Sequence, residues 1–361
     1  MSQPALASPA TDVAAAATPK DVLGRLAEIS RDHAEPSLTE KLAQLRAFIH
    51  DDLAAVEEAL RVVERRPTPL HASAHHLLGL GGKRLRPLCV ALAARMGHGF
   101  GPTARAIAVA VELVHNATLL HDDVVDLGDV RRGAPAARMV YGNAASIFAG
   151  DWLLVNALSR VHATGESELV GRILRVLEEM LAGESLQLKN RGVLRASLDD
   201  YFRVVEGKTA SLFGFALYGG GRAGLLAESQ CAALELFGRK LGVAFQVIDD
   251  VLDVSSDAAT LGKSTFADLR EGKATYPLLV ATAGDNALLD ALENALGGGG
   301  IDEALEARVG EALRRTGAVE ETKRLAKRLS DEGLAAVSAL PDSPAKLALL
   351  DVAQAMLQRR K

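Results

Sequence analysis

The chain of 361 residues is poor in cysteine and in aromatic side chains, since it carries two Cys and only 4% Phe, Trp and Tyr. Cys89 and Cys231 lie far apart in apolar segments, which excludes a disulfide framework and the close spacing of a zinc site. We therefore expect two buried thiols in a protein of a reducing compartment. The sequence contains no run of the roughly 18–20 apolar residues that a membrane span needs.

The first 19 residues contain no Lys or Arg, although Ala, Ser, Thr and Pro are frequent. A secretory signal needs a basic region and a transit peptide is rich in Arg, so neither is indicated. We predict a disordered tail over residues 1–19 and one domain over residues 20–361, located in the cytoplasm. The formal net charge of −5 gives no reason to expect nucleic-acid binding.

Helical periodicity dominates the sequence after the tail. Apolar residues recur at spacings of three and four, as at Leu42, Leu45 and Ile49, and the sustained alternation typical of strands is lacking. Helices are predicted over residues 20–34, 38–65, 71–79, 84–96, 102–126, 140–163, 167–190, 198–219, 224–254, 275–283, 301–316, 318–335 and 343–359. Breaks are predicted at Gly81-Gly82, Gly97 to Pro102, Gly128 to Pro135, Gly219 to Gly221 and Gly297 to Gly300.

Two of these helices, 102–126 and 224–254, are apolar nearly all round until their ends. A helix of this kind is normally buried, so both should lie at the centre of a bundle. The predicted fold class is therefore all-α, a single large helical bundle with a central cavity between these two helices.

Each of the two central helices ends in an acidic motif, HDDVVD at residues 121–126 and IDDVLD at residues 248–253. Residues four apart share one face of a helix, so Asp122 lies over Asp126, and the second motif repeats this spacing. Such like charges repel each other, and burying them uncompensated is costly. A single motif is often a solvated helix face, but two copies after apolar helices favour divalent cations, and oxygen ligands suit Mg²⁺. A diphosphate bound between two metal-binding helix ends would explain both acidic motifs.

Basic side chains supply the complementary charge. Lys83 and Arg86 lie three apart where Gly81-Gly82 opens a helix, and helix N–H groups and guanidinium groups both bind anions. Other basic side chains are Arg131, Arg132, Lys208, Lys263 and Lys273, and Thr209 follows Lys208 directly as a hydroxyl donor. His115 and Gln246 lie on the acidic stripes of the two helices, where a polar group needs a partner. An isolated basic pair is usually solvated surface, but these lie beside acidic motifs and so predict two phosphorylated substrates.

Taken together, these motifs resemble the trans-prenyl diphosphate synthase family, from about residue 38 to the C-terminus. The segments that carry the resemblance are GGKRLRP at 81–87, LLHDDVVD at 119–126, RRG at 131–133, GD at 150–151, GE at 183–184, KT at 208–209, FQVIDDVLD at 245–253, LGK at 261–263 and DLREGKATYP at 268–277. The residues around Asp122 are most similar to octaprenyl-type members. The resemblance implies the all-α isoprenoid synthase bundle and head-to-tail condensation of isopentenyl diphosphate with an allylic diphosphate, with farnesyl diphosphate as the expected primer.

The resemblance also implies how the substrates are held. Three Mg²⁺ per active site bind the allylic diphosphate through Asp122, Asp123, Asp126, Asp249, Asp250 and Asp253. The same diphosphate contacts Arg131, Lys208, Thr209, Gln246 and Lys263. Isopentenyl diphosphate contacts Lys83, Arg86, His115 and Arg132. The expected catalytic residues are Asp122, Asp126, Lys208, Asp249 and Asp253, and the released diphosphate acts as the base. A homodimer is expected, with a peripheral membrane contact for product release.

Product length should depend on the floor of the cavity below the first motif. The predicted floor residues are Ala117, Thr118 and Val114, and residues 111–120 contain no aromatic side chain. Short-chain members of the family carry aromatic plugs near this point, so an open floor favours a medium or long product, for the side chain of a respiratory quinone. Geranylgeranyl diphosphate remains the alternative product, because plugs can come from other helices.

Two other classes of protein fit the sequence less well. A terpene cyclase on the same fold would need aromatic walls to steer cations and a different second metal motif, and the 4% aromatic content disfavours it. A non-catalytic metal-binding or regulatory subunit would be expected to lose one acidic motif, whereas this chain has both.

Overall fold

The computed structural model describes residues 36–255 and 266–358, so the predicted tail and the predicted helix 20–34 lie outside the described residues. The longer helices are α2 (Pro36–Arg61), α3 (Pro69–Gly79), α4 (Leu85–Arg95), α5 (Pro102–Val125), α7 (Asn143–His162), α8 (Ser167–Lys189), α10 (Ser211–Ala223), α11 (Glu228–Ser255), α16 (Glu303–Thr316), α17 (Ala318–Val337) and α18 (Pro344–Leu357). The shorter ones are α6 (Ala137–Tyr141), α9 (Leu198–Val205), α13 (Ala267–Arg270), α14 (Tyr276–Thr282) and α15 (Asn286–Asn294), with π-helical turns η1 (Glu206–Ala210) and η2 (Ala295–Gly299).

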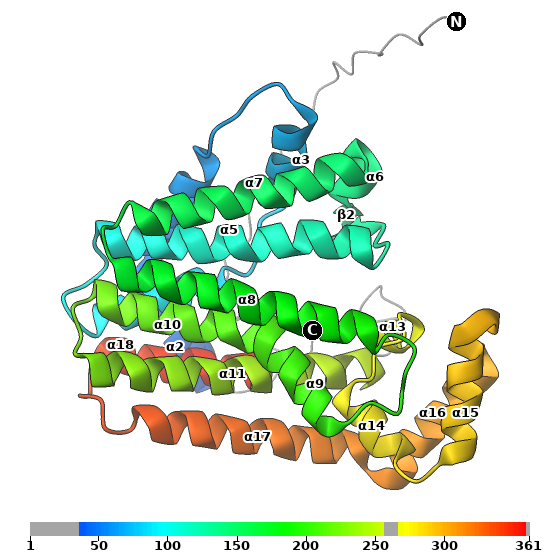
Figure 1. Ribbon diagram of the computed structural model, residues 1–361. Coiled ribbons are helices and arrows are strands. Elements are labelled where there is room, and N and C mark those ends of the chain that lie inside the picture. The colour runs from blue at the N-terminus through cyan, green and yellow to red at the C-terminus, as the bar shows by residue number, and fades with distance from the viewer. Residues whose placement is uncertain (1–35, 256–265, 359–361) are drawn as a thin grey trace, which may run out of the picture.

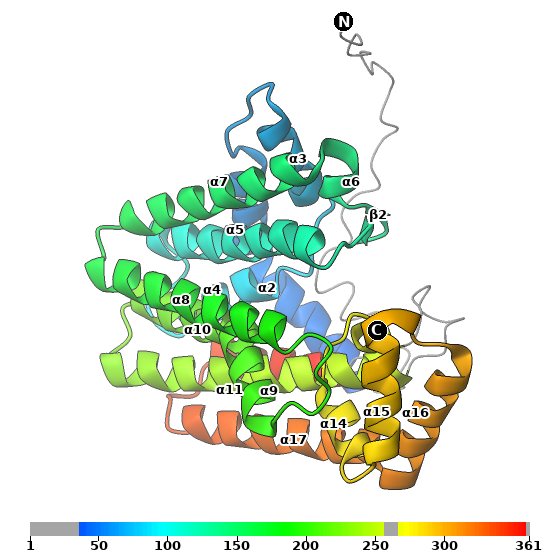
Figure 2. The ribbon, with the colours of Figure 1, turned by 45° about the vertical axis from the view of Figure 1, so that its right-hand side comes forward.

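The helices are stacked in layers (Figure 1). α5 packs against α7 on one side of the molecule, while α11 packs between α10 and α17 on the other. α8 runs between the α5–α7 pair and α10, as the turned view also shows (Figure 2). α13 to α16 gather at one end of the bundle, near the C-terminal end of α5. The predicted all-α fold class is confirmed.

The main buried cluster of apolar side chains runs from α2 through α11 and includes residues of α17 and α18. α5 is buried along most of its length, for example at Ile107, Val111 and Val114, which are 0% exposed. α11 is buried in its middle turns, as at Leu241 and Val247. Both helices therefore lie where a nearly all-round apolar pattern predicts them. The assignment of residues 20–361 to a single domain stays a prediction.

The predicted break at Gly219 to Gly221 is wrong, because these glycines lie inside α10. These glycines allow two helices to pack closely and do not form a turn. A Cβ atom on Gly220 would lie 2.5 Å from the carbonyl oxygen of Val90 and 2.8 Å from Cβ of Ala93 on α4. Gly224, directly after α10, would clash with Ala94 O at 2.5 Å in the same way. The absence of side chains here allows α10 to lie directly on α4.

Other boundaries also differ from the sequence-based expectation. The predicted helix 140–163 is divided at Gly142, whose φ of +86° separates α6 from α7. The predicted helix 198–219 contains η1, where a Cβ on Gly207 would lie 2.4 Å from Glu179 O of α8. No helix is predicted over residues 286–294, but α15 forms there, with Asp285 accepting a hydrogen bond from Leu288 N at 3.0 Å.

Strands are predicted to be absent, yet β1 (Val130–Arg131) and β2 (Ala134–Pro135) form a short antiparallel pair. Arg132 and Gly133 form its turn, with φ values of +54° and +79°. The pair shapes the loop that follows the first acidic motif. Among the described residues, none of the helices is both long and apolar enough to cross a membrane.

Replacing Gly220 with Ala should lower the free energy of unfolding by about 2 kcal/mol, because the added methyl group overpacks the α4–α10 contact. Urea unfolding followed by circular dichroism measures the change. Gly171→Ala in α8 is the matched control, since its Cβ would meet only the flexible end of Arg175 at 3.7 Å. That control should be neutral or slightly stabilising. Equal losses in the two variants would contradict this account of α10.

Candidate active site

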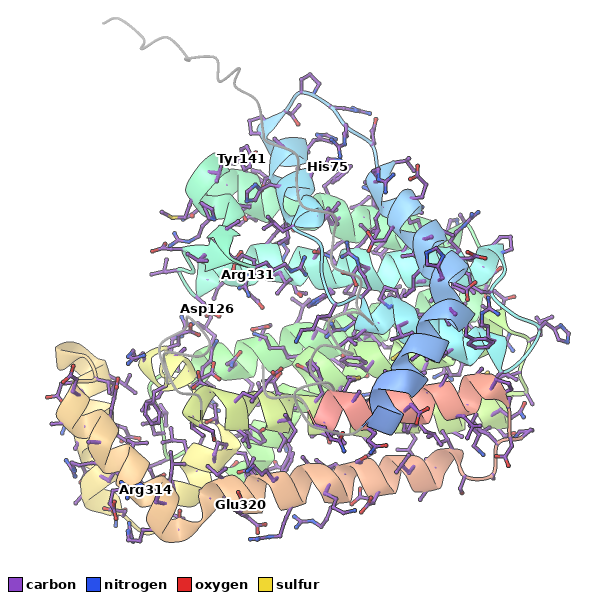
Figure 3. All side chains as sticks on the ribbon, turned by 180° about the vertical axis from the view of Figure 1, so that it is seen from behind. His75, Asp126, Arg131, Tyr141, Arg314 and Glu320 are labelled. Carbon is purple, nitrogen blue, oxygen red and sulfur yellow. The ribbon has the colours of Figure 1, made fainter. Side chains whose placement is uncertain are left out.

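The two acidic motifs meet at the end of the bundle where α13 lies. Asp126, at the end of α5, is seen there together with Arg131 in the view from behind (Figure 3). Lys273 connects the two sides: its Nζ lies 3.2 Å from Asp126 Oδ2 and 4.0 Å from Asp268 Oδ1. Asp268 N in turn donates to Asp253 Oδ2 of the second motif at 3.3 Å. The structure thus brings the ends of α5 and α11 to one site.

Lys208 occupies the centre of this site. The π-helical turn η1 presents it, and its Nζ lies 2.6 Å from Glu184 Oε1 and 3.6 Å from Asp122 Oδ2. It also donates to Gln187 Oε1 at 3.1 Å. Lys208 therefore carries a positive charge directly beside the first carboxylate of the first motif.

Asp122 of the first motif and Asp253 of the second hold protons more tightly than an ordinary Asp. Burial raises the pKa of Asp122 to about 6, and the neighbouring charges of Glu184 and Asp126 add to this effect. Burial and the charge of Asp268 raise the pKa of Asp253 to about 7. Asp249 is half-buried and its charge acts on Asp268. The ionised forms of Asp122 and Asp253 are therefore unfavourable unless further cations bind beside them.

The middle aspartate of each motif is buried and engaged by the protein itself. Asp123, 1% exposed, accepts a hydrogen bond from Arg131 Nε at 2.8 Å. Asp250, 2% exposed, accepts from Tyr201 OH at 2.7 Å and from Gln246 Nε2 at 3.1 Å. This geometry favours a positioning role for these two carboxylates over the metal-binding role expected from the resemblance.

A chain of polar contacts links the second motif to η1. Thr209 Oγ1 donates to Gln246 Oε1 at 3.2 Å, and Gln246 donates to Asp250. Thr209, Gln246 and Lys208 line a second, smaller cavity of about 130 Å³. Of the side chains expected to contact the allylic diphosphate, Lys208, Thr209 and Gln246 are thus brought together. Lys263 lies outside the described residues.

A larger, mainly apolar cavity of about 460 Å³ opens beside the first motif. Asp122, Asp126 and Lys208 line its polar end, and Lys208 also lines the smaller cavity. Its apolar walls come from α7 and α8, namely Leu154, Leu177, Met180, Leu181 and Leu188. Of the predicted floor residues, Thr118 lines this cavity, while Ala117 and Val114 are 0% exposed and are not among its lining residues.

The predicted isopentenyl diphosphate residues lie around Gly81-Gly82. Arg132 Nη1 donates to Gly81 O, and a Cβ on Gly82 would lie 3.1 Å from Arg132 Nη2. Arg86 stacks on Phe213 with its Cζ 4.5 Å from the ring centre, and within the described residues its buried Nε has no hydrogen-bond partner. Lys83 is half-buried at the start of α4. A buried donor without an internal acceptor, such as Arg86 Nε among the described residues, suits an anion.

His115 belongs to the same basic group. Burial, together with the positive charges of Arg86 and Arg132, keeps the pKa of His115 well below its ordinary value. The imidazole is therefore neutral near neutral pH. It can donate or accept a hydrogen bond without adding a charge.

A buried ion-pair network supports this basic group. Arg84, with a φ of +44°, pairs with Glu112 and with Glu57, the latter at 2.6 Å. Arg84 holds the pKa of Glu112 down at about 2, although burial alone would raise it. Asn116 donates to Glu112 Oε1 at 3.1 Å. These residues were not predicted from the sequence. Glu112 could have been, because a polar side chain inside an apolar helix needs a partner, which is the signal that identified His115.

The donor set fits Mg²⁺ bound together with a phosphorylated ligand. Within residues 36–255 and 266–358, no three His, Cys, Asp or Glu side chains converge closely enough to bind an ion by themselves. Mg²⁺ typically uses one or two carboxylates plus water and substrate phosphates, so such a cluster is not required. Asp122 and Asp126 on one side and Asp249 and Asp253 on the other are the oxygen donors available to it.

This all-α bundle combines facing acidic helix ends, an adjoining apolar cavity and a separate basic site. Such an arrangement is typical of an enzyme that acts on apolar chains carrying a diphosphate. The chain belongs to the polyprenyl synthetase family, whose model matches residues 67–312. It is therefore a prenyltransferase of the trans-polyprenyl diphosphate synthase type, which confirms the resemblance found in the sequence.

Relatives with assigned names are similar over most of their length. The chain is 36% identical to octaprenyl diphosphate synthase of Escherichia coli, covering 89% of this chain and 98% of that protein. It is 37% identical to heptaprenyl diphosphate synthase component 2 of Geobacillus stearothermophilus, covering 87% and 97%. A crystal structure of polyprenyl synthase from Caulobacter crescentus, complexed with calcium and isoprenyl diphosphate, matches with a TM-score of 0.82 at 35% identity, covering 88% and 98%.

The raised pKa of Asp122 predicts a pH-dependent stability of the metal-free protein. Because its pKa rises from 3.8 to about 6 on folding, the protonated form is favoured in the folded state, and this stabilisation is lost as pH rises through 6. Asp122→Asn, which resembles the protonated form, should stabilise the metal-free protein at pH 8 by about 1–2 kcal/mol and leave stability at pH 4 unchanged. Urea unfolding in the presence of EDTA tests this. A stability difference that is the same at both pH values would contradict it.

Proposed function

We propose that the protein condenses isopentenyl diphosphate with an allylic diphosphate, farnesyl diphosphate being the primer, and produces a medium- or long-chain all-trans polyprenyl diphosphate. The observation that carries this proposal is the position of the apolar cavity, whose polar end is formed by Asp122, Asp126 and Lys208. A diphosphate bound at these groups would have its prenyl chain in the apolar part. The named relatives that make heptaprenyl and octaprenyl diphosphate support a long product.

The allylic diphosphate would bind between the two motifs. Mg²⁺, which we place at three positions per site, would neutralise the charge that develops on the leaving diphosphate. Lys208, beside Asp122, would donate to a diphosphate oxygen, and Thr209 and Gln246 would orient the group from the smaller cavity. Asp123 would hold Arg131, whose remaining N–H groups can reach a phosphate. The apolar walls would keep water from the allylic cation.

Isopentenyl diphosphate would bind at the basic group around Gly81-Gly82. Arg132, Arg86 and Lys83 would supply positive charge, and the neutral His115 would supply a hydrogen bond. The double bond then attacks the allylic cation and a proton is lost. We assign proton removal to the released diphosphate, as the resemblance to the family implies. The product is expected to serve as a quinone side chain.

A second copy of the chain fits the exposed apolar side chains of α7 and α8. On α7, Phe148 and Val155 are 61% and 60% exposed, and on α8 Leu181 and Leu188 are 70% and 59% exposed. Seven-residue spacing places each pair on one face of its helix. These adjacent faces support the proposed homodimer. We also propose that the protein is located in the cytoplasm. The protein would contact a membrane briefly, and the membrane would take up the apolar product.

Incubation with Mg²⁺, farnesyl diphosphate and isopentenyl diphosphate should yield diphosphate and a longer all-trans product, and EDTA should stop the reaction. Asp249→Ala should lower kcat/KM by about 10³-fold or more, because one metal-binding wall is lost. Asp331→Ala is the matched control, since this aspartate pairs with Lys327 on the exposed face of α17. Failure of the wild-type protein to lengthen the primer would refute the proposal, and a C20 product would select geranylgeranyl diphosphate.

Thr118→Phe should shorten the product, because Thr118 lines the apolar cavity one turn below Asp122. Chromatography of the dephosphorylated products measures the chain-length distribution. Ala117→Phe tests the floor expected from the sequence, and its smaller effect on length is predicted because Ala117 is fully buried outside the cavity lining. An unchanged distribution in Thr118→Phe would place the floor elsewhere.

A further inference from the structure

Two cations of the protein hold the last carboxylate of the first motif. Arg191 Nη2 pairs with Asp126 Oδ1, and Lys273 Nζ lies 3.2 Å from Asp126 Oδ2. The side chains of Asp126 and Arg191 are 19% and 35% exposed, so their contact is only partly shielded from water. Burial would raise the pKa of Asp126, but Lys273, then Lys208 and Arg191, together lower it. Asp126 thus differs from Asp122, whose pKa is raised.

Arg191 reaches Asp126 from a turn that is docked on the opposite side of the site. The turn follows α8, and Gly192 N donates to Gly272 O at 2.8 Å. Gly192 and Gly272 have φ values of +78° and +76°, and a Cβ on Gly272 would lie 2.8 Å from Gly192 N. This close contact, which requires glycine, places Arg191 beside the loop that carries Lys273.

The guanidinium group of Arg191 also belongs to the mouth of the apolar cavity. Arg191 lines that cavity together with Asp122, Asp126 and Lys208, and its Nη1 donates to Val125 O at 3.3 Å. A guanidinium has five N–H donors in a planar fork that matches a phosphate edge. Arg191 is therefore placed where a diphosphate at the first motif would be within its reach.

Lys273 and Arg191 differ in the carboxylate partners that each keeps if Asp126 no longer pairs with them. Lys273 keeps Glu271 and the nearby Asp268 as partners. Arg191 pairs, among the described residues, with no carboxylate other than Asp126. A metal ion that binds Asp126 alone would leave Arg191 partly buried without a counter-ion, which is unfavourable.

We propose that Arg191 couples metal binding to diphosphate binding: it neutralises Asp126 in the free enzyme and moves to a diphosphate oxygen when a divalent cation takes its place. This inference rests on the proposed function. Metal alone binds weakly because it must displace Arg191, and diphosphate provides that side chain with a new partner. Each ligand then strengthens the binding of the other by the same factor.

Isothermal titration calorimetry with Mg²⁺ and inorganic diphosphate, each alone and in the presence of the other, tests this coupling. In Arg191→Ala, Mg²⁺ alone should bind about fivefold more tightly, while inorganic diphosphate should bind the metal-loaded protein about tenfold more weakly. The coupling factor should fall accordingly. Arg191→Gln removes the charge but keeps a hydrogen-bonding side chain, and should give the same result if the alanine variant folds poorly.

Arg195→Ala is the matched control. It follows in the same segment and pairs on the exposed surface with Asp290 and Glu293, outside both cavities, so coupling should stay at the wild-type value. Wild-type coupling in Arg191→Ala and Arg191→Gln would overturn the role of Arg191 and leave the proposed function intact. Absence of Mg²⁺-dependent diphosphate binding in the wild-type protein would instead count against the proposed function itself.

Discussion

Repulsion among carboxylates gathered at the ends of α5 and α11 is the constraint on which the rest of the site depends. The fold buries Asp122 and Asp253 deeply enough to raise the pKa of each, so their ionised forms need external cations. Lys208 and Lys273 neutralise part of this charge and lie between the two motifs. The remaining negative charge is what an Mg²⁺–diphosphate complex would balance. Affinity for the ligand thus arises from charge that the folded chain leaves uncompensated.

The proposed site for the second substrate differs from the acidic site, because positively charged side chains gather there. Glu112 and Glu57 neutralise Arg84, so the surplus charge is carried by the residues facing the proposed substrate, such as Arg86 and Arg132. Two anion sites of different kind, one formed by metal-binding carboxylates and one by arginines, allow two diphosphates to be distinguished. The apolar cavity begins only at the first of them. This asymmetry supports our proposal that the growing chain binds at the acidic site.

Much of this arrangement could be predicted from the sequence, because it follows from local patterns. Helical periodicity predicted the bundle, and the four-residue spacing of the aspartates predicted their shared faces. Contacts between distant segments could not be found in this way. The glycines of α10 indicate a turn in the sequence but serve close packing on α4, and the pairing of Arg191 with Asp126 joins residues 65 positions apart. The engagement of Asp123 and Asp250 by the protein is likewise a property of the packed structure.

Diffraction from crystals grown with Mn²⁺ and inorganic diphosphate tests the central claim most directly, because anomalous scattering locates the metal without assumptions about its ligands. The account predicts metal peaks within about 2.3 Å of carboxylate oxygens of both motifs, at Asp122 and at Asp249, with the diphosphate between them. Metal at only one motif, or diphosphate bound away from the space between α5 and α11, would contradict the account.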